Sequence, residues 1–279
     1  MMTRRWTICC SLVCSAALSA SPLAGQEPEP ELTPVDKQQI EAALKLTKAE
    51  AAKYVFEIGK SDAKPELQPE PLLRWSNPSV GEVHGYVFLW TVNERPAVVG
   101  SLFKWFTPHT HMSHEFHSLS EAPLSGKYDG AEKWKPRSGG VAFARLPNAP
   151  ALAATPALRL LQMKRFAKEF AATKKERDDS RQELRLLTQP IYRYADPKGE
   201  IADGGLFAFV QGTDPELFLL LEARGKGEAA SWQFAAARMN GVGFDLRYQD
   251  KAVWSVEIMP GREIYSHLEP YTSFMFNMP

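Results

Sequence analysis

Four of the six histidines in this chain fall within nine positions, in the segment "HTHMSHEFH" at residues 109–117. Imidazole is the side chain that most readily binds divalent metals and exchanges protons near neutral pH. Side chains alternate between the two faces of a strand. As a strand, one face of this segment would carry His109, His111, Ser113, Glu115 and His117. A polar face rich in imidazole is what a metal site or an acid–base site requires.

Residues 108–119 also fit a helix, because Met112, Phe116 and Leu119 recur at helical spacing. Histidine and threonine are mediocre helix formers. A predicted hairpin precedes the segment and favours another strand. We therefore favour the strand, although the spacing alone leaves both interpretations open.

Geometry limits what a metal ion could use. Successive strand residues rise by about 3.3 Å, so His109 and His117 would lie roughly 26 Å apart. Because zinc–ligand bonds are about 2.0–2.2 Å long, one ion cannot bind the whole cluster. A near pair can supply two ligands to zinc, manganese or iron. Further ligands would come from His84, His267, Asp203, Asp214 or Glu222. The simpler interpretation is a set of neutral, hydrogen-bonded histidines.

The segment "HTHMSHE" resembles the HxHxxxE core of the first cupin motif, in which two histidines and a glutamate bind a metal. The resemblance implies that His109, His111 and Glu115 are the ligands. It is partial, because Phe103 and Ala122 stand where that motif has glycine. No later segment resembles the second cupin motif.

Three further side chains are candidates for contact with a ligand: His114, His117 and Trp134. Trp134 lies in "AEKWKP", which we expect to be a loop. There it would either stack on a sugar-like ligand or anchor the loop.

The first 25 residues have the form of a secretory signal peptide: Arg4 and Arg5, then an apolar run of about a dozen residues, then small residues. We expect the general secretory route, with the twin-arginine route as the alternative. All three cysteines fall inside this segment, so the mature chain has no disulfide. Residues 26–34 are rich in proline and glutamate and predict a flexible spacer. Residues 35–279 would form a single domain.

The chain carries 33 basic and 33 acidic residues, without a basic patch interleaved with aromatic residues. We therefore expect no nucleic-acid partner. No segment after the signal peptide is long and apolar enough to span a membrane. The expected location is periplasmic or extracellular.

The remaining pattern predicts an α+β fold with an extensive antiparallel sheet, either a curved sheet or a half-open barrel. Asp36 can cap a short N-terminal helix, and "TKAE" at 47–50 has the form of a second capping box. Residues 85–92 and 97–106 predict a β-hairpin. Thr155-Pro156 can begin a long amphipathic helix near 156–177. Six apolar segments after residue 184 predict further strands.

A weak internal similarity accompanies these elements. Placing Gly85 on Gly204 also aligns Phe88 with Phe207, Pro96 with Pro215 and Leu102 with Leu221. Such matches fit an old duplication, and they equally fit any two hairpins with a proline after the turn.

The segments "LLRWSNP", "VFLWT", "HMSHEFHSLSEAPL" and "FAFVQGTDPELFLLLEAR" resemble an uncharacterised family of exported bacterial proteins of the planctomycete type. The resemblance covers most of the mature chain and implies one conserved domain, without an activity. Our functional hypothesis is a non-enzymatic module that binds a small molecule or a protein beside the histidine-rich segment. The alternative is a metal-dependent enzyme, hydrolytic in type, that uses the 109–117 cluster.

Overall fold

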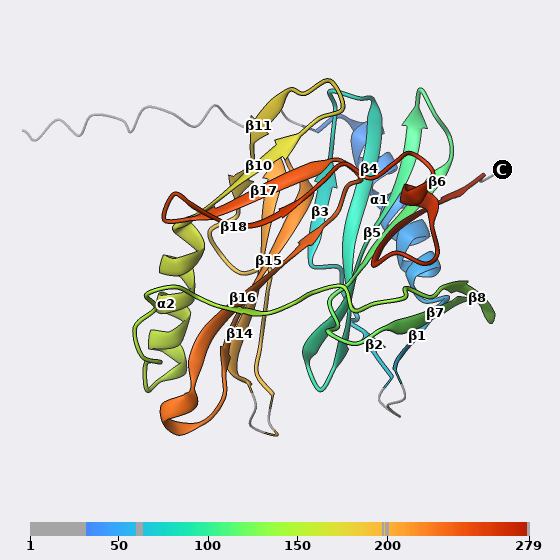
Figure 1. Ribbon diagram of the computed structural model, residues 1–279. Coiled ribbons are helices and arrows are strands. Elements are labelled where there is room, and N and C mark those ends of the chain that lie inside the picture. Colours follow the sequence, from blue (N-terminus) through green and yellow to red (C-terminus); the bar gives the residue numbers. More distant parts are fainter. Residues whose placement is uncertain (1–31, 60–63, 197, 199–200, 278–279) are drawn as a thin grey trace, which may run out of the picture.

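A computed structural model describes residues 32–59, 64–196, 198 and 201–277 (Figure 1). The predicted signal peptide and most of the predicted spacer lie outside these residues. The fold is α+β, with mainly antiparallel strands in four sheets. The half-open barrel that we considered is therefore not observed. In the described part of the chain, no helix combines the length and the apolar character that a membrane span needs.

The first half of the chain contains one helix followed by strands. Its elements are α1 (Pro34–Ala51), β1 (Tyr54–Ile58), β2 (Glu66–Leu67), β3 (Leu73–Ser76), β4 (Glu82–Val92), β5 (Arg95–Thr107), β6 (Met112–Ser118), β7 (Leu124–Tyr128) and β8 (Ala131–Trp134). Strands β2 to β6 form one sheet, and β1, β7 and β8 form a second.

The second half repeats this order. After β9 (Ala144–Arg145), it contains α2 (Pro156–Lys168), β10 (Phe170–Lys175), β11 (Arg181–Glu183), β12 (Arg185–Leu186), β13 (Tyr192–Tyr194), β14 (Ile201–Gln211), β15 (Asp214–Arg224), the short helix η1 (Gly227–Ala229), β16 (Ser231–Arg238), β17 (Gly243–Tyr248) and β18 (Lys251–Val256). The helix η2 (Glu263–Tyr265) and β19 (Tyr271–Phe276) follow. Figure 1 shows the two halves side by side, with α1 and α2 at opposite ends.

The two halves are structural repeats in matching register. Strand β3 places Trp75 opposite Gly85, and β13 places Tyr194 opposite Gly204. Both residues of the second pair lie 119 positions after the corresponding residues of the first pair. The hairpin β14–β15 has the same offset from β4–β5, and the register shifts after Trp90 and after Phe209 coincide. The weak sequence similarity between the two hairpins therefore reflects a repeated architecture.

The ends of the repeats are exchanged. Strand β9 follows the first repeat but pairs with β16 of the second. Strand β19 follows the second repeat but pairs with β6 of the first. Each large sheet is thus completed by a segment that comes from the other repeat.

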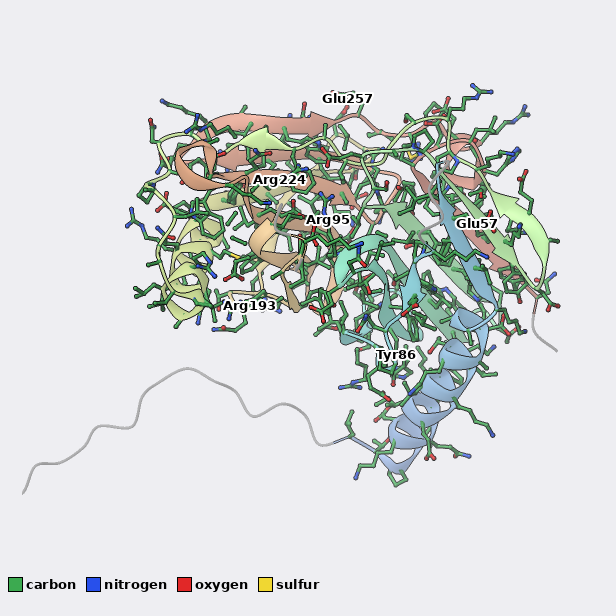
Figure 2. All side chains as sticks on the ribbon, turned by 90° about the horizontal axis from the view of Figure 1, so that it is seen from below. Glu57, Tyr86, Arg95, Arg193, Arg224 and Glu257 are labelled. Atoms are coloured by element: carbon green, nitrogen blue, oxygen red, sulfur yellow. The ribbon has the colours of Figure 1, made fainter. Side chains whose placement is uncertain are left out.

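Helix α1 begins one residue before the predicted domain start and is a single helix. Thr33 is its N-cap and forms a capping box with Asp36. The second helix start that we predicted at Thr47 is wrong, since the Thr47 hydroxyl lies inside the helix and donates to the Ala43 carbonyl at 2.8 Å. On the outer sheet face, the Tyr86 hydroxyl donates to the Ile40 carbonyl of α1 (Figure 2).

Helix α2 starts as predicted, with Thr155 as its N-cap and Pro156 in the first turn. It ends at Lys168, so the predicted helix to residue 177 is wrong. Phe170 begins β10 instead, pairs with Tyr248 of β17 and packs on its ring at 4.7 Å. The helical spacing of Phe170 is real, but cross-strand pairing with a distant segment decides its conformation.

Three apolar clusters give the molecule its layers. Alternate residues of β4 face different clusters: Val83, Val87 and Leu89 face inward, whereas Tyr86, Phe88 and Trp90 face α1 and the β1–β7–β8 sheet. The inward-facing residues pack directly on β14, β15 and β16 of the second repeat and form the central core. The third cluster lies between the second repeat's large sheet, α2 and the β10–β17–β18 sheet.

The aromatic-over-glycine contact provides a test of the repeat. A Cβ atom at Gly85 would lie 2.2 Å from the Trp75 ring, and one at Gly204 would lie 2.5 Å from the Tyr194 ring. We expect Gly85→Ala and Gly204→Ala each to lower the free energy of unfolding by about 1–3 kcal/mol, measured by denaturant titration. Gly261→Ala is the control, because a Cβ there meets nothing within 4 Å. A loss at only one of the two positions would contradict the equivalence of the contacts.

Candidate functional site

The histidine-rich segment is divided between a loop and a strand. His109 and His111 lie in the loop after β5, with their rings 5.4 Å apart and both beside the Trp105 ring. Strand β6 begins at Met112. The strand interpretation therefore holds for 112–118, whereas His109 and His111 lie outside the strand and its alternation.

The buried histidines are neutral. His114 is completely buried, shares a hydrogen bond of 2.9 Å with the Tyr54 hydroxyl and packs on Phe276. Burial lowers the pKa of His114 to about 4, and burial likewise lowers the pKa of His117 to about 4. Because His114 has no exposed surface, it cannot contact a ligand in this conformation. His117 does line a cavity.

Trp134 is an anchor. It lies in β8, is 1% exposed, and its Nε1 donates to the Glu269 carbonyl at 2.8 Å. The expectation that it lies in an exposed loop is wrong, since its ring packs against Phe56 and Phe116 in the outer core. It offers no face to a ligand.

His109, His111 and Glu115 do not form one group. Glu115 lies within β6, beyond the loop that holds the two histidines. Within the described ranges, no three His, Cys, Asp or Glu side chains are close enough together to hold a metal ion. His84 is buried on β4 beside Phe106, and His267 is exposed.

The three carboxylates considered as additional ligands differ in their partners. Asp203 accepts hydrogen bonds from Arg193 at 2.7 and 2.9 Å and from Arg159 at 3.2 Å. Glu222 is fully buried and is held by Arg95, Arg224 and Tyr194. Asp214 has only the Asn77 amide, at 3.4 Å. No arginine or lysine of the described chain forms an ion pair with Asp214.

Asp214 lines a cavity of about 330 Å³ between the two repeats, which we call the acidic cleft. Its polar lining is Asn77, Ser79, Glu115, Lys174, Glu176, Gln211, Asp214, Glu216 and Asn240, and its apolar lining is Trp75, Val80, Val83, Phe103, Trp105 and Met239. Both repeats contribute side chains to this lining. Glu115 belongs to the odd-numbered face of β6, the face that the strand interpretation expected to be polar.

The charges in the acidic cleft are unbalanced. Lys174 is 6% exposed and binds Glu216 at 2.7 Å and Glu176 at 2.9 Å, so it already has anionic partners. Burial and the charge of Glu216 raise the pKa of Asp214 to about 8. Burial, with the charges of Asp214 and Glu216, raises the pKa of Glu115 well above its usual value. Asp214 is thus mainly protonated at neutral pH, and Glu115 is shifted toward its protonated form.

The opposite end of the central interface carries an equivalent cavity of about 250 Å³, which we call the arginine cleft. Seven residues that line the arginine cleft have a lining residue of the acidic cleft at the matching position of the other repeat. The pairs, with the arginine-cleft residue first, are Ile58 and Lys174, Val92 and Gln211, Arg95 and Asp214, Ala97 and Glu216, Leu119 and Met239, Ser120 and Asn240, and Asp196 and Asn77. One architecture therefore holds two clefts with different chemistry.

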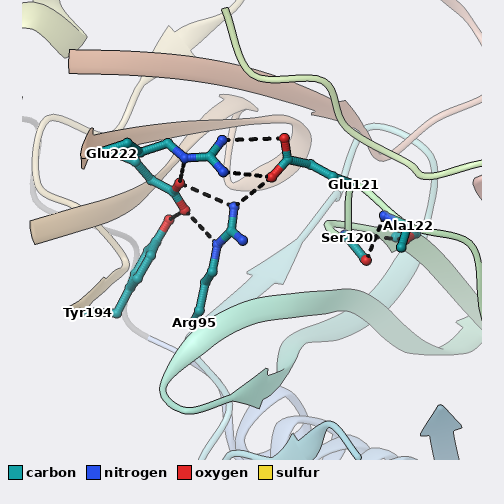
Figure 3. A network of polar contacts seen from close by, with 8 residues as sticks. Arg95, Ser120, Glu121, Ala122, Tyr194 and Glu222 are labelled. Atoms are coloured by element: carbon teal, nitrogen blue, oxygen red, sulfur yellow. Dashed lines mark hydrogen bonds and ion pairs between the residues drawn. The ribbon is translucent and has the colours of Figure 1, made fainter. Parts of the chain in front are cut away.

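The arginine cleft is neutralised by its own side chains (Figure 3). Arg95 from the first repeat binds Glu222 of the second at 3.0 Å, and Glu121 binds both Arg95 and Arg224. Burial acts to lower the pKa of Arg95, but the charge and hydrogen bond of Glu222 outweigh it and raise that pKa. In Figure 2, Arg95 and Arg224 lie centrally, between the two halves.

Sequence reasoning named Glu115 and Asp214 but missed Lys174 and Glu216. Glu216 could have been recognised as the charged residue that begins the apolar segment "ELFLLLEAR". It stands at the position where the first repeat has Ala97. Lys174 falls within the helix predicted near 156–177, and only the pairing of β10 with β17 places it in a buried strand.

No protein-family model matches the chain, and neither a curated protein nor a solved structure matches it. The site is therefore interpreted from its own geometry.

Removing the central anion of the arginine cleft should destabilise the fold. Glu222→Gln leaves Arg95 and Arg224 partly buried without their main partner, so we expect the free energy of unfolding to fall by about 3–5 kcal/mol. Glu121→Gln is the matched control, because Glu121 is 42% exposed and its loss should change stability by less than about 1 kcal/mol. Equal effects in urea unfolding would contradict the dominant role of Glu222.

Removing the unpaired acid should stabilise the fold in a pH-dependent way. The folded protein holds the Asp214 proton up to about pH 8, whereas the unfolded chain releases it near pH 4. The contribution of Asp214 to the free energy of unfolding is therefore at its maximum below pH 4. It declines as the pH rises to 8, by at most about 1.4 kcal/mol per pH unit. We expect Asp214→Asn to gain about 1–3 kcal/mol at pH 8 and nothing near pH 4. A constant difference between pH 4 and 8 would exclude a raised pKa for Asp214.

Proposed function

We propose that this protein is an exported, non-enzymatic binding module whose acidic cleft takes a small ligand with an ammonium or quaternary ammonium group. The observation that carries the proposal is the contrast between the two equivalent clefts. Where the arginine cleft has Arg95 neutralising Glu222, the acidic cleft has Asp214 without a cation. A buried carboxyl group without a cation lowers the stability of the fold, and such groups are typical of functional sites.

The charge of the cleft favours a cation. Lys174 is already bound to Glu216 and Glu176. Its charge acts on Glu115 and Asp214 from a distance, but within the described residues neither carboxyl group forms an ion pair. A ligand cation would supply an ion-pair partner and stabilise both carboxylates. An anionic ligand would instead meet like charge in a site of low polarity.

The aromatic wall favours the same ligand class. Trp75, Phe103 and Trp105 also line the cleft, and the Trp75 and Phe103 rings are 5.1 Å apart. A cation over an aromatic face gains about 0.5–2 kcal/mol, and tryptophan is the best such partner. The Trp75 Nε1 donates to Ser101, which fixes the ring in place.

Export rests on the residue pattern of the first 25 positions, a basic start followed by an apolar run. Periplasmic or extracellular location fits a binding module that meets its ligand outside the cytoplasm. The metal-dependent alternative has no group of three ligand-type side chains among the described residues to support it.

Calorimetric titration of the mature protein with choline tests the proposal, with 3,3-dimethyl-1-butanol as the neutral isostere. Choline should bind, and the neutral alcohol should bind at least about tenfold more weakly. Asp214→Asn should weaken choline binding by about tenfold or more, while Glu121→Gln in the arginine cleft should leave it unchanged.

Proton release provides a second measurement on the same complex. Because Asp214 is protonated at pH 7 and the bound cation favours its ionised form, choline binding should release up to about one proton per site. Titration at pH 7 in buffers of different ionisation enthalpy measures this release, which should shrink at pH 9. Equal affinity for the alcohol, or binding without proton release, would contradict the proposal.

A further inference from the structure

A third cavity, of about 410 Å³, lies beside β6, β16, β18 and β19. We call it the Arg238 pocket. Its apolar lining is Trp254, Val256, Ile258, Met259, Pro260 and Pro270, and its polar lining includes His117, Arg238 and Tyr271. Glu257, Glu263 and Glu269 also belong to the lining, so the pocket combines apolar side chains with a buried guanidinium and carboxylates. Small-molecule sites commonly combine apolar walls with a few placed polar groups.

The buried arginine is the unusual feature. Arg238 is 7% exposed, and its Nη2 donates to the carbonyl oxygens of Val242 and Glu257. Its Nε is enclosed without a hydrogen-bond partner in the described chain. Within the same residues, no carboxylate lies within ion-pair distance of Arg238, whereas Arg95, Arg159, Arg193 and Arg224 each have one.

A guanidinium without an anion is costly to bury, and a carboxylate is the partner that its planar donors fit best. We propose that the Arg238 pocket binds a small apolar molecule with a single carboxylate, which pairs with Arg238 while the apolar body packs against Trp254 and Ile258. This pocket is distinct from the acidic cleft, although Tyr271 in its lining shares a hydrogen bond with Glu115 of that cleft.

The surroundings define the ligand further. His117 donates its Nδ1 proton to the Ser118 carbonyl at 2.9 Å and is uncharged at neutral pH, so it adds no second cation. Glu257 and Glu263 are exposed and also line the pocket. A ligand with a second anionic group would meet these carboxylates, so the site favours monoanions over dianions.

Titration of the ¹⁵N-labelled mature protein with phenylacetate tests the proposal, with phenylacetamide as the neutral match and phenylmalonate as the dianion. Phenylacetate should shift the backbone amides of 254–259, and the other two probes should bind at least about tenfold more weakly. Arg238→Gln should weaken phenylacetate binding by at least about tenfold. Arg165→Gln, an exposed arginine on α2, is the matched control and should keep the affinity within about twofold.

Ile258→Trp provides a second variant that keeps Arg238 and fills the pocket. This variant should also abolish the phenylacetate-induced amide shifts. If Arg238→Gln does not fold, Ile258→Trp alone tests whether phenylacetate binds in the Arg238 pocket. The proposal is overturned if phenylacetate does not bind at millimolar concentration, if phenylacetamide binds equally well, or if folded Ile258→Trp keeps the affinity. Choline binding in the acidic cleft should persist in Ile258→Trp, which separates the two sites.

Discussion

The packing of the two large sheets on one another is the constraint from which the rest of the structure follows. Residues of β4 and β5 face residues of β14, β15 and β16 across the central core. Because the two repeats share one register, this interface has two equivalent ends. Each end leaves a cleft in which side chains at matching positions can diverge without disturbing the apolar contact between the sheets.

The two ends illustrate opposite uses of buried charge. At one end, Glu222 and Glu121 pair with Arg95 and Arg224, and these ion pairs join the repeats. At the other end, Asp214 and Glu115 form no ion pair within the described residues, and burial raises the pKa of both carboxyl groups. Buried charges that are paired support the fold, whereas buried acids without partners weaken it and create affinity for a cation.

Local patterns in the sequence predicted local structure well. The β4–β5 hairpin follows from β-branched and aromatic residues around a short turn, and the start of α2 follows from Thr155-Pro156. The end of α2 was missed, because Phe170 continues the helical spacing and only its distant partner Tyr248 makes it a strand. Strand alternation from the sequence groups Glu115 with the odd-numbered residues of β6, and Glu115 lines the acidic cleft. Its association with Lys174 and Glu216 depends on pairing between distant strands, which spacing along the chain does not reveal.

The exchange of end strands between the repeats has a consequence for how the chain reaches its native state. The edge of the first repeat's sheet, at β6, is covered by β19, the strand that leaves the ribosome last among those described. Until that strand arrives, β6 exposes unpaired backbone groups, and the first repeat cannot close. The large sheet of the first repeat is therefore completed only after β19 has been synthesised, whereas the sheet of the second repeat receives β9 from a segment that precedes it in the chain.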